Sequence, residues 1–179
     1  MPFDPTSAVL RTTGADGWTL VDPLTYLGRR DRFVVPAGFG TDLATVPRPV
    51  LWLVPAAGRY TLAAVLHDWL CTVGIATGTV TSRQADGLFR RAMREADVPV
   101  LLRWLMWTGV RWGAVADADP QRRRGWLLSA PGVLAISALA APLVLPPSLL
   151  VVPGLAVYAA LERLVSGRAG VRPWSRRRH

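Results

Sequence analysis

The pattern of hydrophobic and polar positions divides the chain into a mixed front part and a long apolar run near the C-terminus. Up to about residue 118, apolar and polar residues recur at spacings typical of short strands and amphipathic helices. From Gly125 to Val165 the chain is apolar apart from one charged pair, Glu162–Arg163. We therefore expect a soluble domain over residues 1–118, followed by a membrane element.

The first third of the chain favours strands and turns. Trp18–Val21 and Arg32–Val35 are short β-prone runs, and the polar stretch Gly28–Asp31 predicts a turn between Tyr26–Leu27 and the second run. Thr41–Pro49 follows as a rigid loop, because its two prolines exclude a helix.

Three helices are expected after this loop. Arg59–Thr72 is almost wholly apolar, which is typical of a buried central helix. The next helix begins at a capping box formed by Thr81 and Gln84. Asp97 ends it, and a third helix covers Pro99–Gly113. The sequence thus predicts an α+β domain, with a small β/loop element packed on about three helices.

The apolar run is interpreted as a helical transmembrane hairpin over residues 126–165. Trp126–Leu145 carries no charge, and a helix of this length spans about 30 Å, the thickness of a bilayer core. Pro146–Pro147 interrupts the run, and Ser148–Leu161 supplies a shorter second arm. That short arm leaves open a buried helical pair within a larger assembly. The residues expected to anchor the hairpin are Trp126, Leu145, Leu149 and Leu161.

Basic residues flank the run on both sides. The chain has a net charge of +9, and its basic residues are all arginine. They concentrate in a linker at 119–125 and in a tail at 166–179, so the positive-inside rule places both ends in the cytoplasm. Anionic lipid is the expected partner of the tail. Nucleic acid is disfavoured, because no nucleic-acid-binding signature is present.

Several common kinds of site are excluded or disfavoured. Cys71 is the single cysteine, so no intrachain disulfide can form. Two histidines argue against a zinc site of the usual ligand count. The N-terminus does not have the pattern of a signal peptide. Glycine-rich phosphate loops, GxSxG and HExxH are not found.

Three motifs carry polar residues within otherwise apolar surroundings. They are Gly38–Arg48, Ala64–Leu70 and Ser82–Met93, followed by a Val110–Gly113 ending. In this order they resemble the phage- and prophage-borne family catalogued as domain of unknown function 1353, over about Phe33–Gly113. The resemblance implies a phage or prophage origin and a single polar site, and it names no substrate.

The polar residues allow two interpretations. In the enzymatic one, His67 is a general base oriented by Asp42 or Asp86, with Asp68 as a second carboxylate, and the group hydrolyses its substrate or holds a divalent metal such as Mg²⁺ or Mn²⁺. In the structural one, the same residues form a buried ion-pair lattice. A nucleophilic Cys71 is disfavoured. The expected substrate- or partner-binding residues are Arg48, Arg83, Arg111 and Trp107.

Two functions follow from these expectations. The first is a phage-derived, membrane-anchored protein that acts at the host envelope in an accessory, structural or lysis-related role. The alternative is a membrane-tethered hydrolase. The layout of the hairpin loosely resembles a two-span phage holin, although holins do not carry a large front domain. Expected partners are membrane lipid, phage or host envelope proteins and a second copy bound through the hairpin. The expected location is the host inner membrane or the phage particle.

Overall fold

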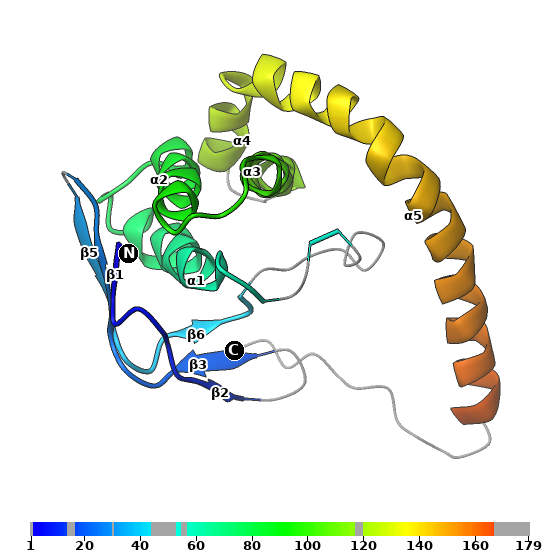
Figure 1. Cartoon of the computed structure of the whole chain (residues 1–179), viewed down its shortest axis with the longest axis horizontal. Helices are drawn as coiled ribbons and strands as arrows, with labels where there is room; N and C mark the ends of the chain where they lie inside the picture. Colours follow the sequence, from blue (N-terminus) through cyan, green and yellow to red (C-terminus); the bar gives the residue numbers. More distant parts are fainter. Residues whose placement is uncertain are drawn as a thin grey trace. The chain divides into compact units, whose positions relative to one another are not determined.

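The fold is mixed α+β, as the sequence predicts (Figure 1). The computed structural model describes residues 2–13, 17–29, 31–43, 53–54, 57–116 and 120–166. The chain divides into two compact units, Met1–Ala140 and Ala141–His179. The first unit contains the sheets and the helices that surround the candidate site.

Two small antiparallel sheets make up the β part. One has the strand order β1-β4-β5, with bounds Phe3–Asp4, Leu24–Leu27 and Arg32–Val35. The other has the order β2-β3-β6, with bounds Leu10–Thr12, Trp18–Leu20 and Gly40–Thr41. The two runs expected on either side of a turn form a β-hairpin, because β4 pairs with β5 in a register that places Leu27 opposite Arg32.

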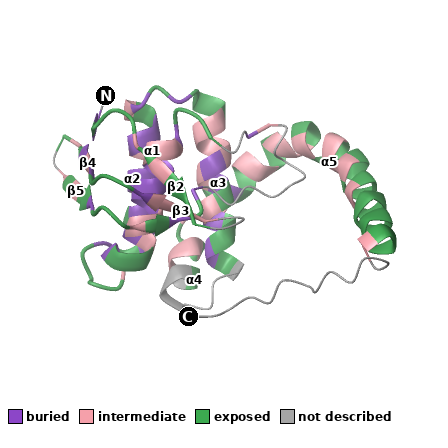
Figure 2. Cartoon of the chain, turned by 90° about the horizontal axis from the view of Figure 1, so that it is seen from below, coloured by how far each residue is buried: buried purple, intermediate pink, exposed green. Residues whose placement is uncertain are grey.

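The helices of the first unit follow the predicted order. Their bounds are α1 Thr61–Trp69, α2 Ser82–Glu95, α3 Val100–Ala116 and α4 Pro120–Leu127. A π-helical turn, η2 (Leu70–Gly74), continues α1. The central position predicted for α1 is confirmed: Val65 and Leu66 are completely buried, and α1 contacts both α2 and the strands β5 and β6 (Figure 2).

Both ends of α2 are closed by hydrogen bonds. The predicted capping box is present, with the Thr81 hydroxyl accepting from the Gln84 backbone and the Gln84 side chain accepting from the Thr81 N–H. At the other end, Asp97 adopts the left-handed region (φ 55°). Its N–H donates to Arg94, and the next N–H, of Val98, donates to Met93. This pair of bonds is the Schellman arrangement that commonly ends a helix.

The apolar run forms one helix, α5 (Ala130–Ser166), rather than a hairpin. The expected break at Pro146–Pro147 is wrong: both prolines lie inside α5, as do Pro142 and Pro153. Proline removes a ladder hydrogen bond and favours a kink, but its fixed φ is still helical, so the helix can continue past it. Among the described residues, α5 is the one helix long and apolar enough to cross a membrane.

The globular unit extends further than the expected boundary at residue 118. Val133, in the first turn of α5, is fully buried, and the ring of Trp126 packs on Trp112 with centroids 5.4 Å apart. The indole N–H of Trp112 donates to Ser137 over 3.0 Å. Most of the expected linker 119–125 is therefore helix α4, and Trp126 belongs to the first unit rather than to the membrane element.

Candidate functional site

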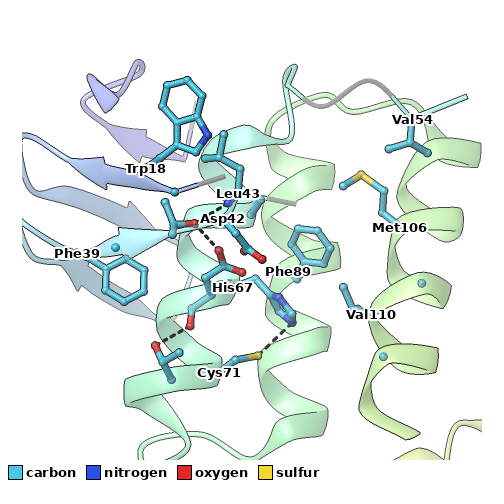
Figure 3. A pocket seen from close by; sticks show the side chains of 18 of the residues that line it. Trp18, Phe39, Asp42, Leu43, Val54, His67, Cys71, Phe89, Met106 and Val110 are labelled. Carbon is cyan, nitrogen blue, oxygen red and sulfur yellow. Dashed lines mark hydrogen bonds between the residues drawn. The ribbon is translucent and has the colours of Figure 1, made fainter. Parts of the chain in front are cut away.

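A pocket of about 810 Å³ lies between the β2-β3-β6 sheet and helices α1 and α3 (Figure 3). Its polar side is built by Asp42, which follows β6, and by His67, Asp68 and Cys71 from the α1–η2 segment. Apolar side chains complete the wall, among them Trp18, Phe39, Phe89, Met106 and Val110. The volume and the few convergent polar groups are typical of small-molecule sites.

Asp42 and Asp68 form a carboxyl pair at this pocket. Asp68 is hydrogen-bonded to Asp42, and this contact raises the pKa of Asp68. The Thr41 hydroxyl donates to Asp68 Oδ2 and accepts from the Leu43 N–H at 2.9 Å. Leu43 has a φ of 64°, which a branched side chain rarely adopts. Leu43, directly after Asp42, thus holds a strained backbone conformation.

The environment of Asp68 favours its protonated form. Burial raises the pKa of this carboxyl most, and the adjacent Asp42 raises it further. The Thr41 hydroxyl and the charge of His67 act in the opposite direction. The resulting pKa of Asp68 is about 7, against an ordinary value of 3.8. Asp68 therefore keeps its proton in most molecules below about pH 7.

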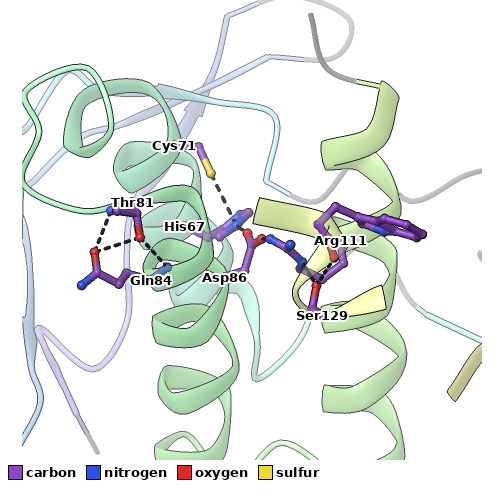
Figure 4. A network of polar contacts seen from close by, with 8 residues as sticks. His67, Cys71, Thr81, Gln84, Asp86, Arg111 and Ser129 are labelled. Carbon is purple, nitrogen blue, oxygen red and sulfur yellow. Dashed lines mark hydrogen bonds and ion pairs between the residues drawn. The ribbon is translucent and has the colours of Figure 1, made fainter. Parts of the chain in front are cut away.

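A buried network lies beside the pair (Figure 4). His67 Nε2 lies 2.8 Å from Asp86 Oδ1, and Arg111 Nη1 donates to Asp86 Oδ2 over 2.6 Å. Arg111 Nε donates to the Ser129 hydroxyl, which donates to the Trp126 carbonyl. Arg111 and Asp86 are each 1% exposed. The network joins α1, α2, α3 and the chain that follows α4.

The opposite charges of His67, Arg111 and Asp86 shift the pKa values within this network. Burial alone would lower the pKa of His67, but the hydrogen bond and charge of Asp86, together with Cys71, outweigh it and the pKa is raised. Burial would likewise raise the pKa of Asp86, but His67 and Arg111 outweigh it and the pKa is lowered. Both shifts favour a protonated His67 beside an ionised Asp86.

Cys71 does not form a relay with His67. The Cys71 sulfur lies 3.5 Å from His67 Nε2, the nitrogen that also contacts Asp86. A nucleophilic triad instead uses the two ring nitrogens for its two partners. The ligand atoms of His67, Cys71 and Asp86 lie within 4.8 Å of one another and suit Zn²⁺ by type. Arg111 already supplies positive charge to Asp86, however, and this charge opposes a metal cation there.

A family model described as a protein of unknown function (DUF1353) matches residues 18–110, just over half of the 179 residues. The chain belongs to this family. No curated protein and no solved structure matches it. The match confirms the resemblance inferred from the motifs. Within the DUF1353 segment lie β3 to β6, α1, η2, α2 and most of α3, so it contains the carboxyl pair and two helices of the buried network.

The structure brings together the four residues predicted to be catalytic, but in two groups. Asp42 contacts Asp68, whereas His67 contacts Asp86. Adjacent residues of a helix point in different directions, which separates His67 from Asp68.

The predicted binding residues are dispersed. Arg111 is part of the buried network, Trp107 faces Arg90 with a ring distance of 5.7 Å, and Arg83 is exposed on α2. Arg48 lies outside the described residues. Of the predicted anchoring residues, Leu145, Leu149 and Leu161 are exposed on α5.

Two residues that complete the site were missed by sequence reasoning. Thr41 positions Asp68, and Ser129 extends the buried network. Thr41 directly precedes Asp42 within the first motif, and this position beside a candidate acid could have indicated that its hydroxyl belongs to the site. Ser129 lies outside every motif and only the folded chain shows its role.

Proposed function

We propose that this protein is a membrane-anchored hydrolase of phage or prophage origin that acts at the host cell envelope. The observation that carries the hydrolytic assignment is the Asp42–Asp68 pair, two carboxyls in contact at the wall of a pocket. Burial and the adjacent Asp42 raise the pKa of Asp68 to about 7, so Asp68 can act as the proton donor of the pair. The origin rests on the motif resemblance, and the anchoring on the length and hydropathy of α5.

The contact between the carboxyls favours amide substrates. Glycosidases separate their two carboxyls by about 5–9.5 Å, to fit a sugar or a water between them. A pair that shares a proton instead activates one water towards a carbonyl carbon, as in the aspartic proteases. The proposed substrate class is therefore an amide or peptide bond of the envelope.

The reaction would run in two balanced steps. Asp42 takes a proton from water as the water oxygen bonds to the carbonyl carbon, while protonated Asp68 gives its proton to the carbonyl oxygen. The first step leaves a tetrahedral intermediate with two hydroxyl groups on the former carbonyl carbon. In the second step Asp42 gives its proton to the nitrogen, the carbon–nitrogen bond breaks, and one of these hydroxyls gives a proton to Asp68. The products are an acid and an amine, and the pair is restored.

In this scheme the buried network has a supporting role. Asp86 holds His67 on the same helix that carries Asp68, and the positive charge of His67 lowers the proton affinity of Asp68. His67 is a positioning residue here.

The test uses the full chain in nanodiscs, incubated with peptidoglycan and with internally quenched peptides between pH 4 and 8. Wild type is expected to release new amino termini and to incorporate ¹⁸O from labelled water into the acid product. Asp42→Asn and Asp68→Asn should remove this activity without loss of folding, whereas Asp22→Asn, at an exposed position, should retain it. Cleavage that survives in Asp68→Asn, or no cleavage by wild type, would contradict the hydrolytic assignment.

A further inference from the structure

A second pocket, of about 750 Å³, opens on the other side of α2. We call it the basic pocket, because its lining includes Arg90, Arg91, Arg94 and Arg103. None of its described lining residues also lines the first pocket, which contains Asp42 and Asp68.

The positive charge of the basic pocket is only partly neutralised. Among the described residues of its lining, Asp31 is the one acidic residue, and it pairs with Arg91 over 2.5 Å. Within the described part of the chain, Arg90, Arg94 and Arg103 have no carboxylate within 4 Å. Three guanidinium groups therefore converge on one cavity, and no carboxylate of the described residues pairs with them. Burial and the charges of Arg94 and Arg103 lower the pKa of Arg90, as expected for cations held together.

Aromatic stacking fixes the orientation of Arg90. Its guanidinium carbon lies 4.3 Å from the ring centroid of Trp104 and 5.7 Å from that of Trp107. The two indoles are themselves packed edge to face at 5.6 Å. Stacking uses the face of a guanidinium and leaves its N–H donors free in the plane. Arg90 is thereby pre-organised to bind an anion with two parallel hydrogen bonds.

We propose that the basic pocket binds a phosphate-bearing organic molecule. The phosphate is held by Arg90, Arg94 and Arg103, whose fork-shaped donors match phosphate oxygens. A phosphomonoester carries a charge of about −1.5 to −2 at neutral pH, which offsets most of this cluster. The organic part packs on Phe33 and Trp104, which line the same cavity. The cavity volume lies within the range of small-molecule sites and exceeds the need of a bare ion.

Binding is tested on the full chain in nanodiscs made of neutral lipid, by calorimetry with phenyl phosphate and with inorganic phosphate. Phenyl phosphate is expected to bind more tightly, because its ring adds contact with the aromatic wall. The double variant Arg94→Gln/Arg103→Gln should weaken phenyl phosphate binding by about tenfold or more, since charge-assisted hydrogen bonds are lost. Arg11→Gln removes the same charge at an exposed position on β2 and should leave binding unchanged. Thermal unfolding of each variant checks that the fold is retained.

Two sources of the phosphate are distinguished with dihexanoyl phosphatidic acid, added below its micelle concentration. Tighter binding of this lipid than of phenyl phosphate, lost in the double variant, identifies a lipid head group as the ligand. Equal or weaker binding identifies a soluble phosphate ester. The proposal is overturned if wild type binds no phosphate probe, or if the double variant binds phenyl phosphate as tightly as Arg11→Gln. These outcomes do not depend on Asp42 or Asp68, so they leave the hydrolytic assignment to its own test.

Discussion

Asp86 is the residue whose loss should cost the fold most, because it neutralises two buried cations. Replacing it by asparagine leaves the Arg111 guanidinium, 1% exposed, without a counter-charge. Breaking a buried ion pair in this way costs about 3–5 kcal/mol. We expect Asp86→Asn to lower the free energy of unfolding by this amount.

The matched control is Asp31→Asn, which makes the same substitution in the partly exposed pair with Arg91. Exposed pairs contribute about 0–1 kcal/mol, so this variant should unfold almost as wild type does. Chemical unfolding of both variants in the same detergent gives the comparison. Equal losses in the two variants would show that the network does not stabilise the fold.

Asp68 should make stability depend on pH in a defined direction. Its pKa is about 7 in the folded chain and 3.8 as the ordinary value, so the folded chain binds this proton more tightly. The contribution of this bound proton to the stability of the fold is complete below about pH 4. It declines as the pH rises and is lost above about pH 7. Asp68→Asn has no titrating group at this position, so its stability should not show this dependence. The difference in melting temperature, variant minus wild type, should therefore be larger at pH 8 than at pH 4. Melting temperatures of both proteins at pH 4, 6 and 8 measure it, and a gain that is larger at pH 4 would refute the assignment.

The sequence identified the residue types of the site but not their pairing. Helical spacing places Arg90 four residues after Asp86 and Arg111 four residues after Trp107, the separation of neighbours on one helix face. Asp86 bonds instead to Arg111, 25 residues away, and Arg90 stacks on Trp104. Contacts across helices fix these partners, and local spacing carries no information about them.

Among the elements, α2 ends in a conformation that its terminal residue does not favour. Asp97 holds a φ of 55°, where glycine is the usual residue, and its carboxylate lies near the negative end of the helix dipole. We expect Asp97→Gly to raise the free energy of unfolding by about 0.5–1 kcal/mol. Asp97→Asn removes the charge and retains a side chain, so it should gain only the electrostatic part. Unfolding curves at low and high salt separate the two parts, and a loss of stability in Asp97→Gly would contradict this account.

Strong local signals predicted elements well, and weak ones did not. The capping box and the β4–β5 hairpin are confirmed because both depend on residues that are neighbours in the chain. Strands β1, β2 and β6 were missed, since two or three residues show no periodicity and only their partners hold them in sheets. The proline pair in α5 was interpreted as a break, but proline weakens a helix without always ending it.

At the scale of the whole molecule, membrane association should depend on the second unit. We expect the full chain to stay with neutral-lipid vesicles after a high-salt wash, because insertion of an apolar helix is not screened by salt. A chain ending at Ala140, the boundary between the two units, should remain in the supernatant. Vesicle flotation measures both.

A control separates insertion from charge. Replacing Arg172, Arg176, Arg177 and Arg178 by glutamine should weaken binding to anionic vesicles at low salt and leave retention after the wash unchanged. Retention of the shorter chain would place the anchor elsewhere.

Four prolines lie inside α5 beyond its first turn, at positions 142, 146, 147 and 153, and they determine which neighbours this helix needs. Each removes one amide donor, so the carbonyls four residues earlier, at Ala138, Pro142, Leu143 and Leu149, lose their ladder partner. Hydrocarbon offers no replacement donor, and a bare carbonyl there costs several kcal/mol. A single α5 helix surrounded by lipid would therefore carry the free-energy cost of these unpaired carbonyls. Donors from a neighbouring element, or water beside the helix, would remove that cost, so α5 in a bilayer is expected to need a polar neighbour along these carbonyls.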